Sequence, residues 1–415
     1  MSSRKIRLGD FLIRSKIPVD IEDNKKYKRV TIRTKHQGVS VRDFEIGSKI
    51  GTKKQFILKA GQFVLSKIDA MYGAFGIAPD EVDGAIITGN FWAYDYDKNI
   101  VSIEWFNHFT NSPDFYDLCR RASTGITHRK YLDEDFFLSY EVNLPDLNEQ
   151  ENLVVSIDSI REKISSLENE LTHQLTQLEN LNQAILQEAV QGKLVPQDPN
   201  DEPASELLKR IKAEKATLRQ AQGKGKKEKP LPPIKPEEIP FDIPENWVWC
   251  RLGEIGESTI GIIFKPSQVG KIGIPVLRAN NVQNGKIDYA DLILVNTEVR
   301  EKQIANAGDI LLCVRSGSNN LIGKAAMIEK DGMSFGAFMS LYRSEFNSYI
   351  LKFMHSDIFK KQINDKKSTG INQLTQGTLN NIIIPLPPLS EQKRIVEEIE
   401  KQFAKTKQLK EHIIA

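Results

Sequence analysis

Three loops in the second half of the chain gather arginine, asparagine, glutamine and serine around glycine. They are "LRANNVQNGK" (277–286), "CVRSGSNNLIGK" (313–324) and "STGINQLTQG" (368–377). Arginine can form two hydrogen bonds to the major-groove edge of guanine, and asparagine or glutamine can form two to adenine. Matching loops in the first half are "IRTKHQG" (32–38), "SKIDAMYG" (66–73) and "STGITHRK" (123–130). Ordinary turn formation is the alternative interpretation, since asparagine and glycine are common in turns.

These loops and several lysines supply the candidate DNA-contacting residues. Lysines are expected to contact phosphates and so position a duplex, whereas loop Arg, Asn and Gln side chains are expected to read base edges. The net charge is only +2, so a polyanion-binding surface requires local gathering of positive groups. The full candidate set is Arg33, Lys35, Gln37, Lys53, Lys54, Lys67, Arg129, Lys130, Lys265, Arg278, Asn280, Asn281, Arg315, Ser316, Asn319, Asn320, Lys366, Lys367, Asn372 and Gln373.

No catalytic motif accompanies these loops. The sequence lacks GxxxxGK[ST], GxGxxG, HExxH and GxSxG. It also lacks the Pro-Asp and Asp/Glu-x-Lys pattern of metal-dependent nucleases and the Asn/Asp-Pro-Pro-aromatic motif of adenine methyltransferases, and its histidines and three cysteines are not spaced as metal ligands. We therefore expect a non-catalytic binding protein without a metal site. The alternatives are a nuclease or methyltransferase acting alone, and a coiled-coil protein-interaction scaffold without DNA specificity.

Composition indicates a water-soluble chain of more than one domain. Hydrophobic residues make up 40% and charged residues 27% of the chain, as in ordinary soluble proteins. Its length of 415 residues exceeds the usual size of a domain with a single hydrophobic core. No apolar run approaches the ~20 residues of a membrane span. The start "MSSRKIRLGDF" lacks the apolar segment of a signal peptide, so the expected location is the cytoplasm.

Internal repeats determine the predicted architecture. Five phrases recur in the same order, with starting positions separated by 244, 247, 247, 245 and 242 residues. Small drifts of this kind are typical of loop insertions and deletions between two copies of one fold. The pairs are "RLGD" (7) and "RLGE" (251), "AGQFVL" (60) and "AGDILL" (307), "GNF" (89) and "GAF" (336), "STGI" (123) and "STGI" (368), and "LPDLNEQ" (144) and "LPPLSEQ" (386).

Each copy is predicted to be a mixed domain that leads into a helix. Apolar runs such as "GQFVLSKI" and "GDILLCVRSG" indicate strands, and helical segments precede both "STGI" phrases. After the first "LPDLNEQ", apolar residues recur every three or four positions from Leu153 to Ile185, which predicts a helix of about 65 Å. The second phrase also starts a helix, and the two are expected to pair antiparallel as a coiled coil.

The second helix is shorter than the first. Aligned at a separation of 242 residues, Ala415 corresponds to His173. We therefore expect the far part of the first helix, at Leu175, Leu178, Leu181 and Ile185, to lack an intramolecular partner.

Residues 196–246 differ in composition from both copies. Nine of the 18 prolines lie between Pro196 and Pro244, and nine Lys or Arg residues lie between 209 and 229 against two Glu. This composition predicts a linker with polyproline pieces and one short basic helix. Its basic residues are expected to form a solvated face, with phosphate contact as the alternative.

Several of these phrases together resemble the specificity subunit of type I restriction-modification systems. They are "STGI…LPPLSEQKRIVEEIEK", "IPENWVWCRLGEI", "LILVN…AGDILLCVRSGSNNLIGKAAMI" and "LQEAVQGKLVPQD", and the resemblance covers nearly the whole chain. It implies an α+β fold, with two repeated mixed α/β target recognition domains joined by long antiparallel coiled-coil helices. The implied parts are a first recognition domain at 1–145, a spacer helix at 146–195, a linker at 196–246, a second recognition domain at 247–388 and a shortened spacer helix at 389–415.

The resemblance also implies partners for the chain. Each recognition domain would read one part of a split, asymmetric site on double-stranded DNA. The helices would dock two methyltransferase subunits that use S-adenosylmethionine, and restriction subunits that use ATP and Mg²⁺ would complete the complex. The chain itself would hold no cofactor, catalyse no reaction and contact no membrane.

Overall fold

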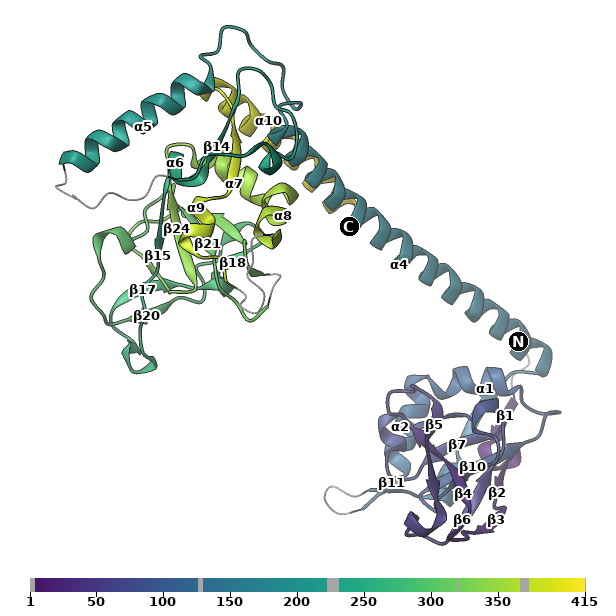
Figure 1. Cartoon of the computed structure of the whole chain (residues 1–415). Helices are drawn as coiled ribbons and strands as arrows, with labels where there is room; N and C mark the ends of the chain where they lie inside the picture. The colour runs from purple at the N-terminus through teal and green to yellow at the C-terminus, as the bar shows by residue number, and fades with distance from the viewer. Residues whose placement is uncertain (1–3, 126–129, 222–230, 319–320, 366–372, 415) are drawn as a thin grey trace. The chain divides into compact units, whose positions relative to one another are not determined.

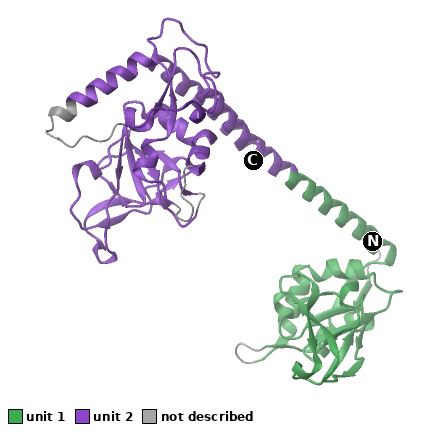
Figure 2. Cartoon of the chain, viewed as in Figure 1, with its two compact units in different colours: residues 1–169 green, residues 170–415 purple. Residues whose placement is uncertain are grey.

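The computed structural model describes residues 4–125, 130–221, 231–318, 321–365 and 373–414. The chain divides into two compact units, unit 1 (residues 1–169) and unit 2 (residues 170–415), shown in Figure 2. The boundary falls within the long helix α4 (Leu147–Val190). The two units are described separately below.

The main sheets in the described part of unit 1 are an antiparallel one of four strands and a mixed one of five, with helices and two further strand pairs beside them (Figure 1). The smaller sheet has the order β2 (Leu12–Ser15), β10 (Phe91–Tyr96), β7 (Phe63–Ser66), β8 (Phe75–Ile77). The larger has the order β3 (Pro18–Asp20), β6 (Lys54–Leu58), β9 (Ala85–Ile87), β4 (Lys26–Ile32), β5 (Val39–Ile46). The two pairs are β1 (Arg4–Arg7) with β13 (Glu141–Leu144) and β11 (Ser123–Thr124) with β12 (Tyr131–Leu132), and the helices are α1 (Ile103–Thr110), α2 (Pro113–Ala122) and α3 (Glu134–Ser139).

Aromatic packing holds the helices of unit 1 on the smaller sheet. The rings of Phe63 and Phe106 meet edge to face at 5.0 Å, and those of Phe75 and Phe115 at 4.9 Å. All four side chains are fully buried. Edge-to-face pairs add about 0.5–1.5 kcal/mol each to the free energy gained by burial, so this cluster fixes α1 and α2 against β7 and β8.

Unit 2 repeats the small sheet of unit 1, which confirms the predicted duplication. Its strands follow the order β15 (Glu257–Ile260), β24 (Met339–Arg343), β21 (Ile310–Cys313), β22 (Ala325–Met327), at positions equivalent to β2, β10, β7 and β8. Strand β14 (Val248–Arg251) pairs with β25 (Ile383–Leu386) as β1 pairs with β13. A further sheet contains β16 (Val269–Gly270), β20 (Ile293–Val295), β17 (Ile274–Leu277) and β23 (Ser334–Phe335). The helices are α6 (Leu252–Ile255), α7 (Asn347–His355), α8 (Asp357–Asp365) and α9 (Gln376–Asn380).

The repeated phrase "LPxLxEQ" forms the same turn from strand to helix in both copies. In each, the buried glutamine donates its side-chain amide to the carbonyl of the phrase's first proline, at 2.9 Å: Gln150 to Pro145 and Gln392 to Pro387. The glutamine backbone also begins the helix, since its N–H donates to Asp146 or Pro388. A buried polar side chain requires hydrogen-bond partners. The glutamine recurs in both copies because its side chain stabilises the turn from strand to helix.

The two long helices meet antiparallel within unit 2. Thr406 in α10 (Leu389–Ile414) donates to the side chain of Asn182 at 2.8 Å, whereas Gln197, just past α4, donates to Glu391 near the start of α10 at 2.6 Å. Figure 1 shows α10 beside the last turns of α4. The predicted antiparallel pairing is therefore correct over this stretch.

The location of the unpaired apolar side chains differs from the prediction. Of the four predicted positions, Ile185 is buried in the core of unit 2, Leu175 and Leu178 are half-buried, and only Leu181, 46% exposed, is open as predicted. The earlier residues Ile160, Ile164 and Leu167 are 56%, 50% and 69% exposed. The alignment at 242 residues treated the helices as parallel. In an antiparallel pair, α10 covers the end of α4 and leaves its earlier turns open.

Within the predicted linker, the described residues 196–221 and 231–246 pack against the rest of unit 2. Helix α5 (Ala204–Ala221) buries Ala204, Leu207 and Leu208 in the core. Lys215 donates to the carbonyls of Gly253 and Gly256 at 3.3 and 2.9 Å. The predicted helix is present, but its apolar face and one of its lysines are used for packing.

Glu391 gives the junction of α4 and α10 a pH dependence. Its side chain is buried, and burial raises the pKa of its carboxyl although Trp247 and Gln197 donate hydrogen bonds to it. Because the folded state holds this proton more tightly than the unfolded chain, the stabilising contribution is largest below pH 4.5, the ordinary pKa of Glu, and falls as pH rises through the raised pKa. Urea titrations at a series of pH values measure this for the wild type and for Glu391→Gln. We expect the unfolding free energy of the wild type, minus that of the variant, to decrease as the pH rises from 4.5 through the raised pKa. A constant difference would contradict this assignment.

Candidate nucleic-acid interface

Backbone hydrogen bonds join three of the predicted loops in unit 1. Lys35 N–H donates to the carbonyl of Tyr72 at 2.7 Å, and Leu132 N–H donates to that of Lys67 at 2.7 Å. These contacts connect the β4–β5 turn, the segment after β7 and the segment after "STGI". The structure therefore brings together Arg33, Lys35, Gln37, Lys67 and Lys130, all at least partly exposed.

His36 anchors the β4–β5 turn to helix α1. Its Nε2 lies 2.9 Å from Thr110 Oγ1, and its ring meets Phe75 edge to face at 5.4 Å. Burial lowers the pKa of His36, so the neutral ring is favoured. Lys35 and His36 both have positive φ, 58° and 53°, which gives the turn its sharp form and leaves Lys35 exposed.

A lysine lies over an exposed aromatic ring at the centre of this cluster. Lys67 Nζ is 5.3 Å from the ring centre of Tyr131, which is 41% exposed. Tyr72, on the adjoining segment, is 58% exposed. Neither tyrosine is among the residues predicted from the sequence. Their positions, one next to "THRK" and one inside "SKIDAMYG", were the available signal.

Unit 2 also holds a cation over an exposed ring in the corresponding region, but from positions that are not equivalent to Lys67 and Tyr131. Arg315 lies with its guanidinium carbon 5.2 Å from the ring centre of Phe338, which is 55% exposed. Arg315 N–H donates to the Phe338 carbonyl, and Arg315 forms a β-bridge with Gln373. Leu374 N–H donates to Val314 just as Leu132 donates to Lys67. Each copy thus places a cation on an exposed ring beside the segment that follows its "STGI" phrase.

The loop after β17 divides the predicted asparagines into two groups. Arg278 and Asn280 are both hydrogen-bonded to the exposed carboxylate of Asp291, at 3.0 and 2.8 Å. Asn281 is buried, accepts from the Arg278 N–H and donates to the carbonyls of Asp288 and Asp291. Asn281 therefore shapes the loop from inside, and only Arg278 and Asn280 lie where a ligand can reach.

The remaining candidates have separate surroundings. Lys53 Nζ donates to Asp23 Oδ1 at 2.5 Å and to the Gly47 carbonyl at 2.7 Å. Its charge is therefore paired within unit 1. Lys54 and Lys265 are exposed, and Ser316 accepts from the N–H of Ser318 at 3.2 Å. Six candidates lie outside the described residues: Arg129, Asn319, Asn320, Lys366, Lys367 and Asn372.

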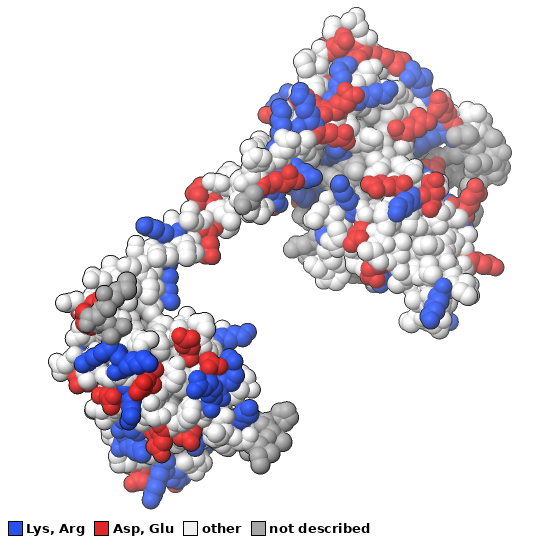
Figure 3. Space-filling view, turned by 180° about the vertical axis from the view of Figure 1, so that it is seen from behind, with Lys and Arg blue, Asp and Glu red and all other residues white. Residues whose placement is uncertain are grey.

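The surface charge is mixed on both units. In the view of Figure 3, Lys and Arg side chains are interspersed with Asp and Glu. Within the described ranges, no group of three or more His, Cys, Asp or Glu residues is placed to hold a metal ion. The three cysteines are buried, and burial raises the pKa of Cys119 to about 12. No helix in these ranges is both long and apolar enough to cross a membrane.

Comparison with known proteins relates this duplicated fold to a family. The specificity subunit of the type I restriction enzyme EcoAI from Escherichia coli is 32% identical over 349 residues, which cover 72% of this chain and 59% of that subunit. The EcoEI subunit from Escherichia coli is 29% identical over 361 residues, with coverages of 73% and 60%. The chain thus spans about 60% of the length of these two relatives.

Solved structures share the fold at low sequence identity. A chain of a type I restriction-modification system, solved in work on complex assembly and conformational transition, has a TM-score of 0.66 at 18% identity and covers 99% of this chain and 93% of its own. The HsdS subunit from Thermoanaerobacter tengcongensis has a TM-score of 0.55 at 18% identity, with coverages of 98% and 91%. The family model of the type I restriction modification DNA specificity domain matches residues 3–177 and 244–415. The chain therefore belongs to the type I restriction-modification specificity family.

Proposed function

We propose that this chain is the DNA-recognition subunit of a type I restriction-modification complex, and that each copy reads one part of a split DNA site. The observation that carries the proposal is a cation held over an exposed ring in the corresponding region of both copies, beside the segment that follows "STGI": Lys67 on Tyr131 and Arg315 on Phe338. A guanidinium stacked on a ring is held in place while its N–H groups stay free for a base edge. Because the residues differ between copies, the two half-sites should differ in sequence.

The partner subunits would supply the chemistry. On this proposal, methyltransferase subunits carrying S-adenosylmethionine dock on the exposed apolar turns of α4 around Ile160, Ile164 and Leu167. ATP- and Mg²⁺-dependent restriction subunits complete the complex. The chain itself is non-catalytic and works in the cytoplasm. The relatives support this assignment, since they are named as specificity subunits of restriction enzymes.

Replacing Arg315 with alanine should relax the specificity of one half-site. Loss of a bidentate arginine–guanine contact costs about 1–3 kcal/mol of discrimination against a wrong base. At the base pair that Arg315 reads, the affinity for an altered duplex divided by that for the intended duplex should rise about tenfold or more in the variant. At every other base pair this ratio should stay unchanged. Binding of the assembled complex to a library of duplexes measures this.

A matched control is Arg300→Ala, which removes the same charge from an exposed arginine at the start of another loop of unit 2. It should leave the base preferences unchanged. Equal weakening on every duplex by Arg315→Ala would show that Arg315 contacts phosphate instead of a base.

A protein-only coiled-coil scaffold is the second candidate. The exposed apolar turns of α4 favour it, because they require a protein partner whether or not DNA is bound. Single-molecule sequencing of adenine methylation, in cells with and without this gene, separates the two. Methylation of a split motif that depends on the gene supports DNA recognition, and an unchanged pattern supports the scaffold.

A further inference from the structure

A proline-rich segment covers one face of unit 2. This segment, Leu231–Phe241, is called the strap below. Arg251 donates from Nε to the carbonyl of Pro232 at 2.7 Å and from Nη2 to that of Pro233 at 3.1 Å, and it pairs with Glu238. The ring of Phe241 meets Trp249 edge to face at 5.1 Å. The strap is therefore recognised by a buried arginine and an aromatic ring on strand β14.

Unit 1 has the same face, and among the residues that the structure describes no segment lies across it as the strap does in unit 2. Leu8 N–H donates to Tyr140 as Leu252 N–H donates to Ile382, and a Cβ on Gly9 would meet Leu138 as one on Gly253 would meet Asn380. The registers of the β1–β13 and β14–β25 pairs agree as well. Arg7 and Lys5 therefore take the places of Arg251 and Trp249.

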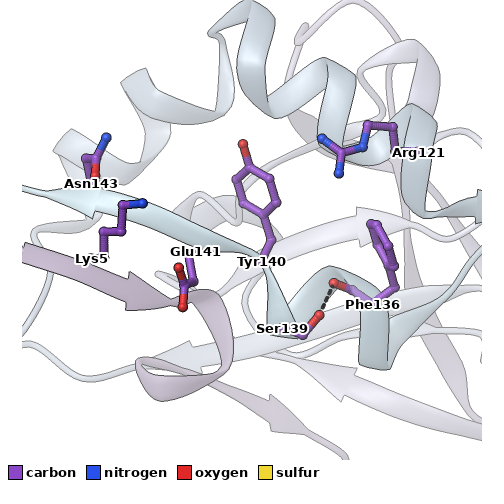
Figure 4. Close-up of a pocket in the computed structure, with 7 residues that line it drawn as sticks. All are labelled: Lys5, Arg121, Phe136, Ser139, Tyr140, Glu141 and Asn143. Carbon is purple, nitrogen blue, oxygen red and sulfur yellow. Dashed lines mark hydrogen bonds between the residues drawn. The ribbon is translucent and has the colours of Figure 1, made fainter.

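The equivalent residues are exposed in unit 1. Lys5 and Arg7 are exposed, whereas the Arg251 side chain is only 3% exposed. A surface pocket of about 410 Å³ lies on this face, lined by Lys5, Arg121, Ser139, Tyr140 and Glu141 among others. Figure 4 shows the Tyr140 ring between Lys5 and Arg121. Ser139 corresponds to Asn381, whose carbonyl accepts from Arg251 in unit 2.

We propose that this face of unit 1, around Lys5 and Arg7, binds an extended, proline-rich segment of a partner protein that carries a carboxylate. Proline-rich segments suit it because they are extended before binding and offer free carbonyls to arginine. Lys5 replaces Trp249, so the partner should present an acidic residue where the strap has Phe241. Lys5 in the pocket and the exposed Arg7 beside it on β1 favour such a segment, since Arg121 is already 3.8 Å from Asp117 and Glu141 is the one acidic residue that lines the pocket. This inference goes beyond DNA recognition and does not require it.

Two synthetic peptides test the proposal on the full chain. One has the sequence of residues 231–242, "LPPIKPEEIPFD", and the other carries Phe241→Glu. We expect saturable one-to-one binding by calorimetry, with the Phe241→Glu peptide at least threefold tighter. Arg7→Ala should weaken binding about tenfold or more, as expected for lost charge-assisted hydrogen bonds. Arg4→Ala, which removes the same charge from the opposite face of β1, should change it less than twofold.

Four results would overturn the proposal. They are absence of binding at millimolar peptide, equal binding by the Arg7→Ala and Arg4→Ala chains, displacement of the peptide by a short non-specific DNA duplex, and Arg7-dependent self-association of the chain without peptide. The third would assign the face to DNA, and the fourth would assign it to another molecule of this chain. Because peptide binding is measured without DNA or partner subunits, its failure leaves the proposed DNA recognition untouched.

Discussion

Replacement of Arg251 with alanine is expected to lower the free energy of unfolding of unit 2 by about 2–3 kcal/mol, because the charge-assisted hydrogen bonds of a buried guanidinium are lost. The guanidinium donates to the carbonyls of Pro232, Pro233 and Asn381 and pairs with Glu238. Without it, these exposed or half-buried acceptors lose a charged donor, and the space that the buried guanidinium fills is left empty. Urea denaturation of the full chain, followed by the fluorescence of its tryptophans, measures this loss.

The equivalent residue of unit 1 supplies the control for this prediction. Arg7 occupies the same position in the repeated "RLG" phrase, but its side chain is exposed. We expect Arg7→Ala to change the free energy of unfolding by less than about 0.5 kcal/mol, as for most surface substitutions. Equal losses for the two variants would contradict the packing of the strap on Arg251. Arg251→Lys should fall between them, since lysine keeps the charge but not the forked geometry.

The repeated phrases predicted the fold well because each reports a local physical requirement. Gln150 and Gln392 close the same turn, and Gly61 and Gly308 both have positive φ, 80° and 91°, at the turn before a buried strand. Such requirements depend on neighbours in the sequence, so both copies kept them. Five such phrases in one order indicated a duplicated domain.

Contacts between distant segments could not be predicted in the same way. Nothing near Lys67 in the sequence indicates Tyr131, and nothing near Arg315 indicates Phe338, because folding brings these rings to the cations. Composition likewise suggested that the strap is a linker. The strap packs because its proline carbonyls accept hydrogen bonds from the buried Arg251. The burial of Arg251 follows from the tertiary structure and cannot be read from the composition of the strap.

Insertion of four helix-forming residues after Ile164 should lengthen the gap between the two half-sites while leaving both half-site sequences unchanged. This expectation rests on the proposed DNA recognition and on the continuity of α4 over 44 residues. Four residues add about 6 Å of helix and about 40° of rotation. At 3.4 Å per base pair along a DNA strand, the added length corresponds to roughly two base pairs.

A seven-residue insertion at the same place provides the matched control. It lengthens α4 but keeps the apolar side chains on nearly the same face of the helix. An insertion of four residues rotates the apolar side chains after the insertion relative to Ile160 before it. An insertion of seven residues returns them to within about 20° of their original direction and adds about 10.5 Å of length. If α4 measures the gap, sequencing of methylated adenines should show a longer gap for both variants. If only the four-residue variant loses methylation, the apolar stripe serves subunit docking and the gap is set elsewhere. A changed half-site sequence in either variant would exclude a spacer role for α4, since the recognition loops lie outside the inserted helix.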